Sequence, residues 1–445
     1  RSERAVLRNN ITGKDSVITT EALTNYNVIV LDQALKNRSF ITFTNTNVIR
    51  NGNARDANVA ALDLQLYDKS NNYGVLIQPR YSKIFDTHGG YDGFKNYIKA
   101  GKVSGKFQFI FSNDIKTAKY DPNDLGFLLS PNEIVNTGKL SYNIYQPTKT
   151  FLNQQYNISL SQSYLYKPFE YERTEIIAKT NWTLKNFWTL QFETGGNPSW
   201  SNDFFELQTP SSMFSTPREK LRRSPYYYLF ASGTTDNRKR LYLNWSIGGS
   251  EGPLPKDPFN KAFAELRYRF SDRFTLTSSY ERQHDHGQFG YSFIRDPVSN
   301  EPILARRQNT VTTSIVSGIY NFTPRMNLTF RARHFWNRIL NTNLYDVKPD
   351  GYWTPRLGTR DPATLNINYN VFNLDVFYTW DFRLGSRIIF AWKNSLGTDY
   401  EDDISGSNYR TYPKNVDRIF TTPHGNEFTI RFIYFLNAQQ FRKRF

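Results

Sequence analysis

A two-residue alternation of apolar and polar side chains recurs in run after run along this sequence. In the last run, every second position is apolar or aromatic: Phe428, Ile430, Phe432, Tyr434 and Leu436. A period of two places the two sets of side chains on opposite faces of a β-strand. The runs have about nine to eleven residues, the length with which a tilted strand crosses a hydrocarbon core, whereas strands of soluble proteins most often have about five or six.

Short and long breaks alternate between these runs. Short turns fall, for example, at 184–187 and 271–274, and the longer polar stretches include 198–224, 283–306 and 341–364. This exchange is typical of a meander whose hairpins are short at one membrane face and extended at the other. We therefore predict an all-β, antiparallel, up-and-down transmembrane β-barrel, one domain over 1–445, with short periplasmic turns and long extracellular loops.

The number of strands follows from the same breaks. We expect about nineteen, within a range of about 18–20 or more, although single-chain bacterial barrels have an even number. One strand is therefore expected to be misassigned or to lie upstream of Arg1. In 366–380 the apolar frame changes, and a β-bulge near Val371 would reconcile the two halves.

Composition excludes membrane-spanning helices and agrees with a barrel. The 445 residues are 38% hydrophobic and 16% aromatic with a mean hydropathy of -0.62, and no run of about 18 apolar residues occurs. Half of each barrel strand faces water, which keeps the mean low. Aromatic residues near the short turns, such as Trp188, Phe274 and Trp380, are typical of an interfacial girdle. A soluble β-sandwich with aromatic corners is the alternative.

Cysteine content and charge bear on location and partners. The chain has no cysteine, which suits the oxidising periplasm and cell surface, so we expect the bacterial outer membrane. Its net charge of +16 raises the question of nucleic acid. The Lys and Arg residues are scattered, without a compact basic cluster, and no nucleic-acid partner is expected. A basic lumen, or contact with outer-membrane lipid and anionic lipopolysaccharide, explains the charge better.

Three segments carry a resemblance to a known family. They are 120–127 (YDPNDLGF) with the hairpin that follows, 191–214 (QFETGGNPSWSNDFFELQTPSSMF) and the strand pair 373–394. They resemble the uncharacterised domain that follows a carbohydrate-binding family-9-like module in Gram-negative outer-membrane proteins. The resemblance implies a large outer-membrane barrel with a sugar-binding module ahead of it, and glycans as possible ligands. That module is not evident in 1–25, and the family supplies no catalytic residues.

Charged side chains concentrate in the polar frame of the strands. They are expected to face the lumen, because a basic residue at the lipid midplane costs about 2 to 4 kcal/mol. The candidates are the basic residues Arg240, Arg267, Arg269, Arg331, Arg333 and Arg431, and the acidic residues Glu193, Glu265, Glu281 and Asp375. Such a lumen favours anionic solutes if open and holds a plug or partner if blocked. A structural ladder of ion pairs is the alternative.

Two clusters could bind metal ions. Asp121, Asn123 and Asp124 offer hard oxygen ligands suited to calcium, although the same residues also form ordinary turns. His284 and His286 could bind a zinc-like ion. A solvated loop tip is the simpler interpretation of the histidines, and bracing of a loop is the simpler interpretation of the first cluster. No cofactor is therefore expected.

The leading functional hypothesis is a transport or docking component of the outer membrane, linked to glycans. In a second hypothesis the barrel is an anchor whose long loops bind a partner in a larger assembly. The contact candidates are Trp200, Phe204, Phe205, Tyr345, Tyr352 and Trp353, because exposed aromatic residues suit contact. A secreted glycan hydrolase on a soluble scaffold is the third hypothesis. No spacing brings two carboxylates together as such an enzyme needs, so no catalytic residue is expected.

Overall fold

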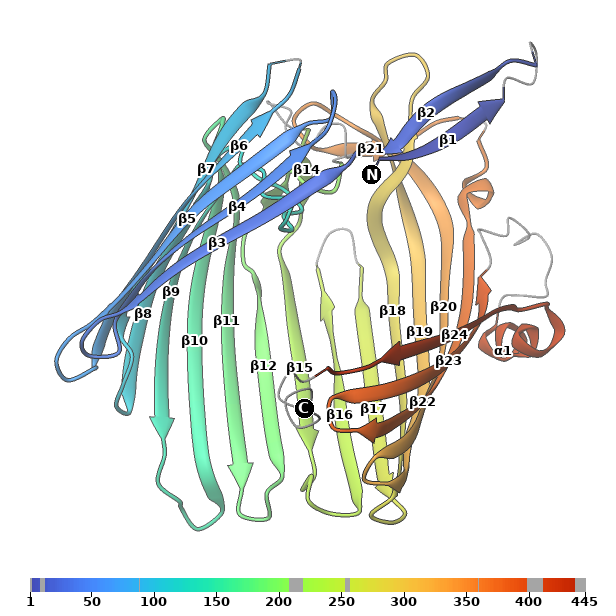
Figure 1. Ribbon diagram of the computed structural model, residues 1–445. Helices are drawn as coiled ribbons and strands as arrows, with labels where there is room; N and C mark the ends of the chain where they lie inside the picture. The colour runs from blue at the N-terminus through green and yellow to red at the C-terminus, as the bar shows by residue number, and fades with distance from the viewer. Residues whose placement is uncertain are drawn as a thin grey trace.

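The chain folds into a large antiparallel sheet rolled into the shape of a barrel (Figure 1). The computed structural model describes residues 2–8, 13–87, 89–207, 219–252, 257–358, 360–397 and 411–436. The long strands are β3 (Thr24–Ala34), β4 (Phe40–Arg50), β5 (Asp56–Tyr67), β6 (Tyr73–Phe85), β7 (Tyr91–Lys102), β8 (Phe107–Lys116), β9 (Glu133–Ile144), β10 (Phe151–Leu165), β11 (Glu170–Leu184), β12 (Thr189–Asn197), β15 (Tyr226–Thr234), β16 (Leu241–Glu251), β17 (Phe259–Arg269), β18 (Phe274–Arg295), β19 (Pro302–Thr323), β20 (Met326–Val347), β22 (Ile367–Arg383), β23 (Ser386–Gly397) and β24 (Gly425–Ile433).

The remaining elements are short. They are the hairpin β1 (Glu3–Arg8) and β2 (Asp15–Glu21), the loop strands β13 (Ser201–Asp203), β14 (Leu221–Arg223) and β21 (Trp353–Pro355), a 3-10 helix (Pro362–Leu365) and the helix α1 (Tyr412–Thr421). No helix in the described part of the chain is long and apolar enough to cross a membrane.

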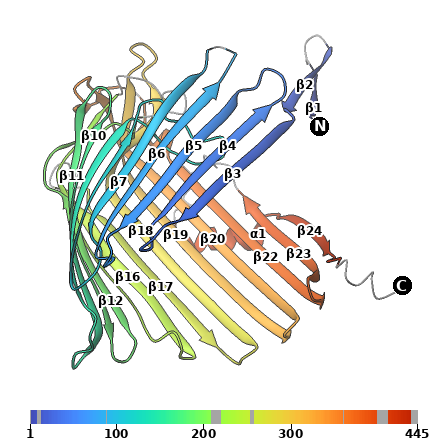
Figure 2. The same cartoon turned by 60° about the vertical axis from the view of Figure 1, so that its left-hand side comes forward.

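Each long strand pairs antiparallel with its neighbour in sequence, as the alternation predicted. Twenty strands of the described chain follow one another in barrel order, and one of them, β21, pairs only with the far end of β20. Nineteen long strands remain, which confirms the expected number. They tilt together around the wall (Figure 2), and tight turns join them at one end. In the turn from β3 to β4, Asn37 and Arg38 have φ of 55° and 59°, as in a type I′ hairpin.

The two faces of the sheet differ in exposure, residue by residue. Along β17 exposed and half-buried side chains alternate: Ala262, Ala264 and Leu266 are exposed, and Phe263, Glu265 and Arg267 are half-buried. The exposed frame is the apolar one and lies on the convex outer surface. The polar frame is crowded by the curvature of the sheet and faces the lumen. The assignment of frames made from the sequence therefore agrees with the structure.

Helix α1 covers part of the outer surface. Residues directly opposite one another in antiparallel strands share a face, and the successive pairs Ala264–Tyr280, Tyr280–Ser314 and Ser314–His334 place His334 on the outer face. The Tyr412 hydroxyl of α1 shares a hydrogen bond of 2.6 Å with Ser314, and its ring lies 5.2 Å from that of His334. The helix thus packs against the outside of the wall, beside β22 to β24 in Figure 1.

The predicted bulge near Val371 is wrong. The register between β20 and β22 runs through this point without a shift, so Asn368 and Asn370 stay on the outer frame in place of apolar residues. Their amides donate hydrogen bonds to Asn415 of α1, at 3.2 Å to the side-chain oxygen and 3.0 Å to the carbonyl. The change of frame in the sequence therefore marks the strand segment that the helix covers.

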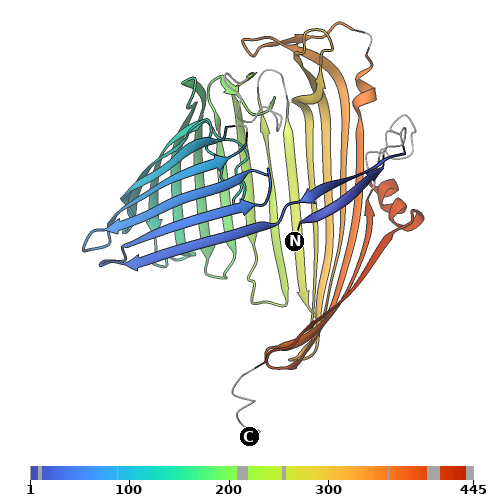
Figure 3. The same cartoon turned by 45° about the horizontal axis from the view of Figure 1, so that its top comes forward.

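The seam of the barrel lies between β3 and β24. Among the described residues, β3 pairs with β4 and β24 pairs with β23, and no register joins β3 to β24. The two strands stand apart in Figure 3. Every residue of β24 is exposed, as is every residue of β3 except Thr24. Among the described residues, a backbone register thus joins each of these two strands to one neighbour only.

Candidate binding cavity at the barrel mouth

The loop that follows β12 folds back across the wall of the barrel. Within it, β13 and β14 form a small antiparallel pair in which Asp203 lies opposite Leu221. The Asn202 amide donates a hydrogen bond of 2.7 Å to the carbonyl of Tyr171 on β11. This bond fixes the small hairpin to the long-loop end of the neighbouring strand.

Arg223 attaches the same hairpin to a second strand at the mouth, β18. One of its guanidinium nitrogens lies 3.1 Å from Asp203 and 3.1 Å from Glu206. The other terminal nitrogen donates a hydrogen bond of 2.7 Å to the carbonyl of Phe289 on β18. A planar guanidinium has donors for all of these acceptors at once, so a single side chain links the hairpin to the extended strand β18.

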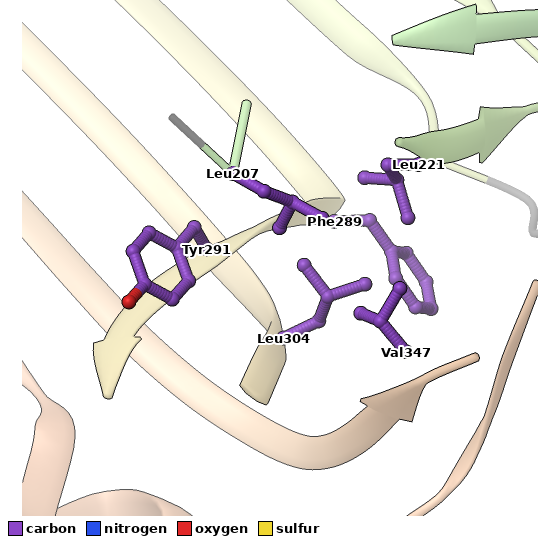
Figure 4. Close-up of a cluster of buried hydrophobic side chains, with 6 residues drawn as sticks. All are labelled: Leu207, Leu221, Phe289, Tyr291, Leu304 and Val347. Carbon is purple, nitrogen blue, oxygen red and sulfur yellow. The ribbon is translucent and has the colours of Figure 1, made fainter. Parts of the chain in front are cut away.

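An apolar cluster packs the long loops against each other above the lumen. Its buried members, drawn in Figure 4, are Leu207, Leu221, Phe289, Tyr291, Leu304 and Val347. Tyr345 and Trp353 pack against it, with ring centroids 4.9 and 4.5 Å from that of Phe289. Three connections distant in sequence meet here, so the cluster holds the long loops of the described chain together.

Between the hairpin and the wall lies a cavity of about 640 Å³. This volume is within the range of small-molecule sites. Its charged lining consists of the carboxylates Glu172, Asp203, Glu206, Glu251, Asp257 and Asp285 and the guanidinium groups of Arg173, Arg222 and Arg223. Its aromatic lining consists of Phe205, Tyr226, Phe259, Phe289 and Trp353. Carboxylates outnumber guanidinium groups, so the cavity is not basic although the chain is.

Two of the carboxyl groups are strongly perturbed. Glu172 is the third residue of β11, at its long-loop end, and is 2% exposed. One oxygen lies 3.4 Å from Arg173 and the other has no hydrogen-bond partner in the described structure. Burial, with a smaller contribution from Glu133, raises the pKa of Glu172 to about 7. In the connection between β16 and β17, burial and then Asp285 raise the pKa of Asp257 to about 6.

The predicted lumen residues occupy the inward frame but do not form one patch. Arg240 precedes β16 in a short turn, and Arg267 and Arg269 both donate hydrogen bonds to the carbonyl of Asn237 in that turn, at 2.6 and 3.2 Å. These three arginines therefore line the short-turn rim. Arg331 lies directly opposite Asp375 in the wall. Arg333, Arg431 and Glu265 lie at intermediate levels of β20, β24 and β17.

The other two acidic candidates pair with lysines that the sequence analysis did not single out. Lys179 lies 3.0 Å from Glu193, and Lys261 lies 2.9 Å from Glu281. Both pairs join neighbouring strands, in agreement with the ladder interpretation at these positions. Their partners could have been found only from the strand register, because they are far apart in the sequence.

The predicted contact aromatics mostly pack inward. Phe204 is 1% exposed, so the prediction that it contacts a partner does not hold in this structure. Tyr345 and Trp353 belong to the loop cluster described above, and Phe205 lines the cavity. Trp200 and Tyr352 lie 6.2 Å apart, and Tyr352 remains exposed. The aromatic content of these loops therefore mainly builds their own core.

The acidic turn at Asp121 is held by arginines. Arg55 donates hydrogen bonds to Asp121 (3.3 Å) and to Asp124 (2.8 Å), and Arg50 lies 2.7 Å from Asp124. The side-chain oxygens of Asp121 and Asn123 also accept backbone hydrogen bonds within the turn. The cluster thus braces a loop through guanidinium groups.

His284 and His286 lie with ring centroids 3.9 Å apart, next to Thr310 and Asn260. Across the described residues, no group of three or more metal-ligating side chains assembles. Binding of calcium or a zinc-like ion remains a prediction from the sequence alone.

Comparison with known proteins defines the family. The model of a domain of unknown function, DUF5916, matches residues 1–445. The chain belongs to the DUF5916 family. This confirms the part of the predicted resemblance that assigns the whole chain to an uncharacterised family. The link to a carbohydrate-binding module remains a prediction. No curated protein matches the chain significantly.

Two solved structures are similar to this DUF5916 member in overall form. One is a mutant of the ferric enterobactin receptor of Pseudomonas aeruginosa, with a TM-score of 0.40, 11% identity, and coverage of 90% of this chain and 67% of the other. The second is OmpT, an outer-membrane protein of Vibrio cholerae, with a TM-score of 0.29, 9% identity, and coverage of 80% and 97%. Similarity at this level adds nothing to the functional argument, which depends on the chain itself.

Proposed function

We propose that this protein is an integral outer-membrane barrel whose mouth cavity receives a neutral glycan on its way to the lumen. Membrane insertion is supported by the convex surface, where large apolar side chains such as Ile158, Leu160, Ile247 and Leu266 are exposed. A soluble protein rarely exposes a continuous apolar surface of this kind. Lipid would cover it, and the polar frame would line the lumen.

The proposal that the protein binds a glycan is supported by the cavity between the small hairpin and the wall. It combines carboxylates and amides with aromatic side chains such as Phe259 and Trp353. Hydroxyl groups of a sugar can donate hydrogen bonds to the oxygens of the lining carboxylates, such as those of Glu206 and Asp257. Aromatic faces can pack against the apolar faces of sugar rings. The excess of carboxylates disfavours an anionic ligand at this point.

Single-channel recording in planar bilayers tests this function. We expect ion conductance, and we expect neutral malto-oligosaccharides added on the long-loop side to interrupt the current. Asp257→Asn should weaken this interruption, because Asp257 lines the cavity. Asp272→Asn is the matched control, since Asp272 is an exposed residue in the short turn at the opposite end. Recovery of the protein without detergent would refute membrane insertion, and oligosaccharides without effect would refute the glycan site.

Docking of a protein partner is the second candidate function. It is favoured by the connection after β20, where Tyr352 and Leu357 are exposed, the latter to 97%. If this loop binds a partner, a stoichiometric protein should co-purify and be lost when 348–358 is shortened. Shortening this loop should leave conductance intact. Enzymatic activity is not part of either proposal.

A further inference from the structure

The outer face of β18 changes from apolar to basic along the strand. On β17 and β18 the outer frame includes Leu266 and Tyr280 below this point, and both are exposed. Above it, the outer frame of β18 continues with Arg282 and His284. The boundary therefore separates an apolar band from a basic band on the same continuous surface.

The basic residues of this band come from β18 and β20, with Thr310 of β19 between them. His284 lies opposite Thr310, Thr310 lies opposite Arg338, and Arg338 lies opposite Asn368. Such directly opposed residues share one face of the sheet. The ring of His286 stacks edge-on against that of His284, at 3.9 Å between centroids. Two arginines and two histidines thus gather on a short stretch of outer surface.

The height of this band coincides with the edge of the hydrocarbon layer. β18 begins at Phe274, next to a short turn, so Arg282 is its ninth residue and His284 its eleventh. A tilted strand crosses the hydrocarbon core with about nine to eleven residues. These side chains therefore emerge where the polar part of the outer leaflet begins.

Among the described residues, no acidic side chain forms an ion pair with the exposed Arg282 of this band. Asp285, between the two histidines in sequence, faces the other way and lines the mouth cavity. On the adjoining helix α1, Asp417 is exposed, together with Lys414. Arg282 therefore presents its positive charge toward the outside.

Helix α1 lies beside this band on the outer surface. It is fixed to the barrel by the hydrogen bonds of Tyr412 and Asn415 described above, and its Phe420 is 82% exposed. An outward aromatic residue close to basic side chains is typical of helices that lie in a membrane interface. The aromatic ring can enter the acyl layer while the neighbouring cations meet headgroups.

We propose that the band formed by Arg282, His284, His286 and Arg338, beside α1, binds the phosphate groups of lipopolysaccharide. Lipopolysaccharide forms the outer leaflet of the outer membrane, on the side of the long loops. Guanidinium groups bind phosphate oxygens through paired hydrogen bonds, and the two imidazoles add donors at the same level. This site is separate from the mouth cavity, because it lies on the opposite face of the wall.

The proposal is tested by measuring the affinity of the detergent-solubilised protein for purified lipid A, with native mass spectrometry. We expect Arg282→Gln combined with His286→Gln to weaken binding at least about 10-fold, which corresponds to about 1.4 kcal/mol. Both side chains are exposed, so the variant should fold. Its folding is checked by gel electrophoresis, where the unheated variant should migrate like the unheated, unchanged protein. Arg269→Gln, on the lumen frame, is the matched control and should bind lipid A normally.

The lipid itself supplies the second comparison. Dephosphorylated lipid A should bind the unchanged protein more weakly than lipid A, and inorganic phosphate at equal concentration should not compete. The site would be overturned if the double variant bound lipid A as tightly as the unchanged protein, or if the Arg269→Gln control lost as much affinity as the double variant. Equal binding of the dephosphorylated lipid would overturn phosphate recognition. Conductance and its response to oligosaccharides should be unchanged in the double variant, so this test is independent of the cavity.

Discussion

The carboxyl group of Glu172 lies in a place where a charge is costly. Burial raises its pKa from 4.5 to about 7. Between these values the folded protein holds a proton that the unfolded chain releases, so stability falls as pH rises through this window. The difference amounts to about 3 kcal/mol at alkaline pH. Protonation of this one group therefore stabilises the hairpin end of β11 in mildly acidic medium.

We predict that Glu172→Gln removes most of this pH dependence. The variant should resist unfolding by guanidinium better than the unchanged protein at pH 8 and about equally at pH 4, because the amide carries no charge. Tryptophan fluorescence at the two pH values measures the midpoints. If the unfolding midpoints of the variant and the unchanged protein shifted equally with pH, the carboxyl group of Glu172 would have to be solvated. Glu193→Gln, at a lysine-paired carboxylate, provides the comparison.

A second prediction at this scale concerns Arg55. It contacts Asp121 and Asp124, which are 2% and 6% exposed, so Arg55→Ala leaves buried carboxylates with fewer partners. We expect a loss of about 3 kcal/mol and faster proteolysis within 117–132. Lys83→Ala removes a solvent-exposed partner of Asp92 and should change stability by less than about 1 kcal/mol. Similar effects of the two substitutions would contradict the bracing role.

At the scale of elements, the apolar cluster decides whether the long loops stay packed. Phe289→Ala removes a ring that contacts Tyr345 and Trp353, and such a truncation costs about 3–5 kcal/mol in a packed core. We expect faster amide exchange in β13, β14 and β21, with the wall unchanged. Phe293, on the same strand, is 81% exposed, so Phe293→Ala should have little effect. Unchanged exchange after Phe289→Ala would mean that polar contacts alone hold the loops.

The element α1 shows why one strand departed from the expected pattern. Asn368 and Asn370 occupy outer positions that lipid would penalise, and hydrogen bonds to Asn415 compensate for this. The sequence of β22 contains the irregularity, but its cause lies more than forty residues further along the chain. A change of frame could therefore be detected from the sequence, whereas its interpretation as a bulge was wrong.

At the scale of the whole molecule, an odd number of strands shapes the seam. Among the nineteen long strands that the structure describes, the first and last run in the same direction, so β3 and β24 cannot pair antiparallel. Even numbers are the rule in bacterial single-chain barrels. Strand edges that pair on one side only are also prone to pair with additional strands. We therefore expect the seam to be the least stable part of the wall.

We predict that amide hydrogens of β3 and β24 exchange several-fold faster than those of β10 and β11, which are paired on both sides. An amide that bonds no neighbouring strand is protected only by local packing. Exchange followed by mass spectrometry in lipid nanodiscs measures the difference. Equal protection would show that another strand, from this chain or elsewhere, occupies the seam. The peptides of β10 and β11 serve as the internal reference.

The sequence by itself determined the class of fold, the direction of each strand face and the sides of the short turns and long loops. These properties depend on residues only one or two positions apart: the adjacent residues Leu266 and Arg267 have opposite characters, and this suffices to orient β17. The frame of the lumen charges was predictable for the same reason. Their partners, such as Lys179 for Glu193, depend on the register between strands.

Only the tertiary structure decided the cavity, the loop cluster and the band beside α1. Glu172, Arg223 and Asp257 come from three separate segments, and no local pattern brings them together. Phe204 could be read as a contact residue because an aromatic side chain in a long loop has the same sequence signature whether it is buried or exposed. Burial depends on which loops meet, and that is fixed by packing between segments far apart in the chain.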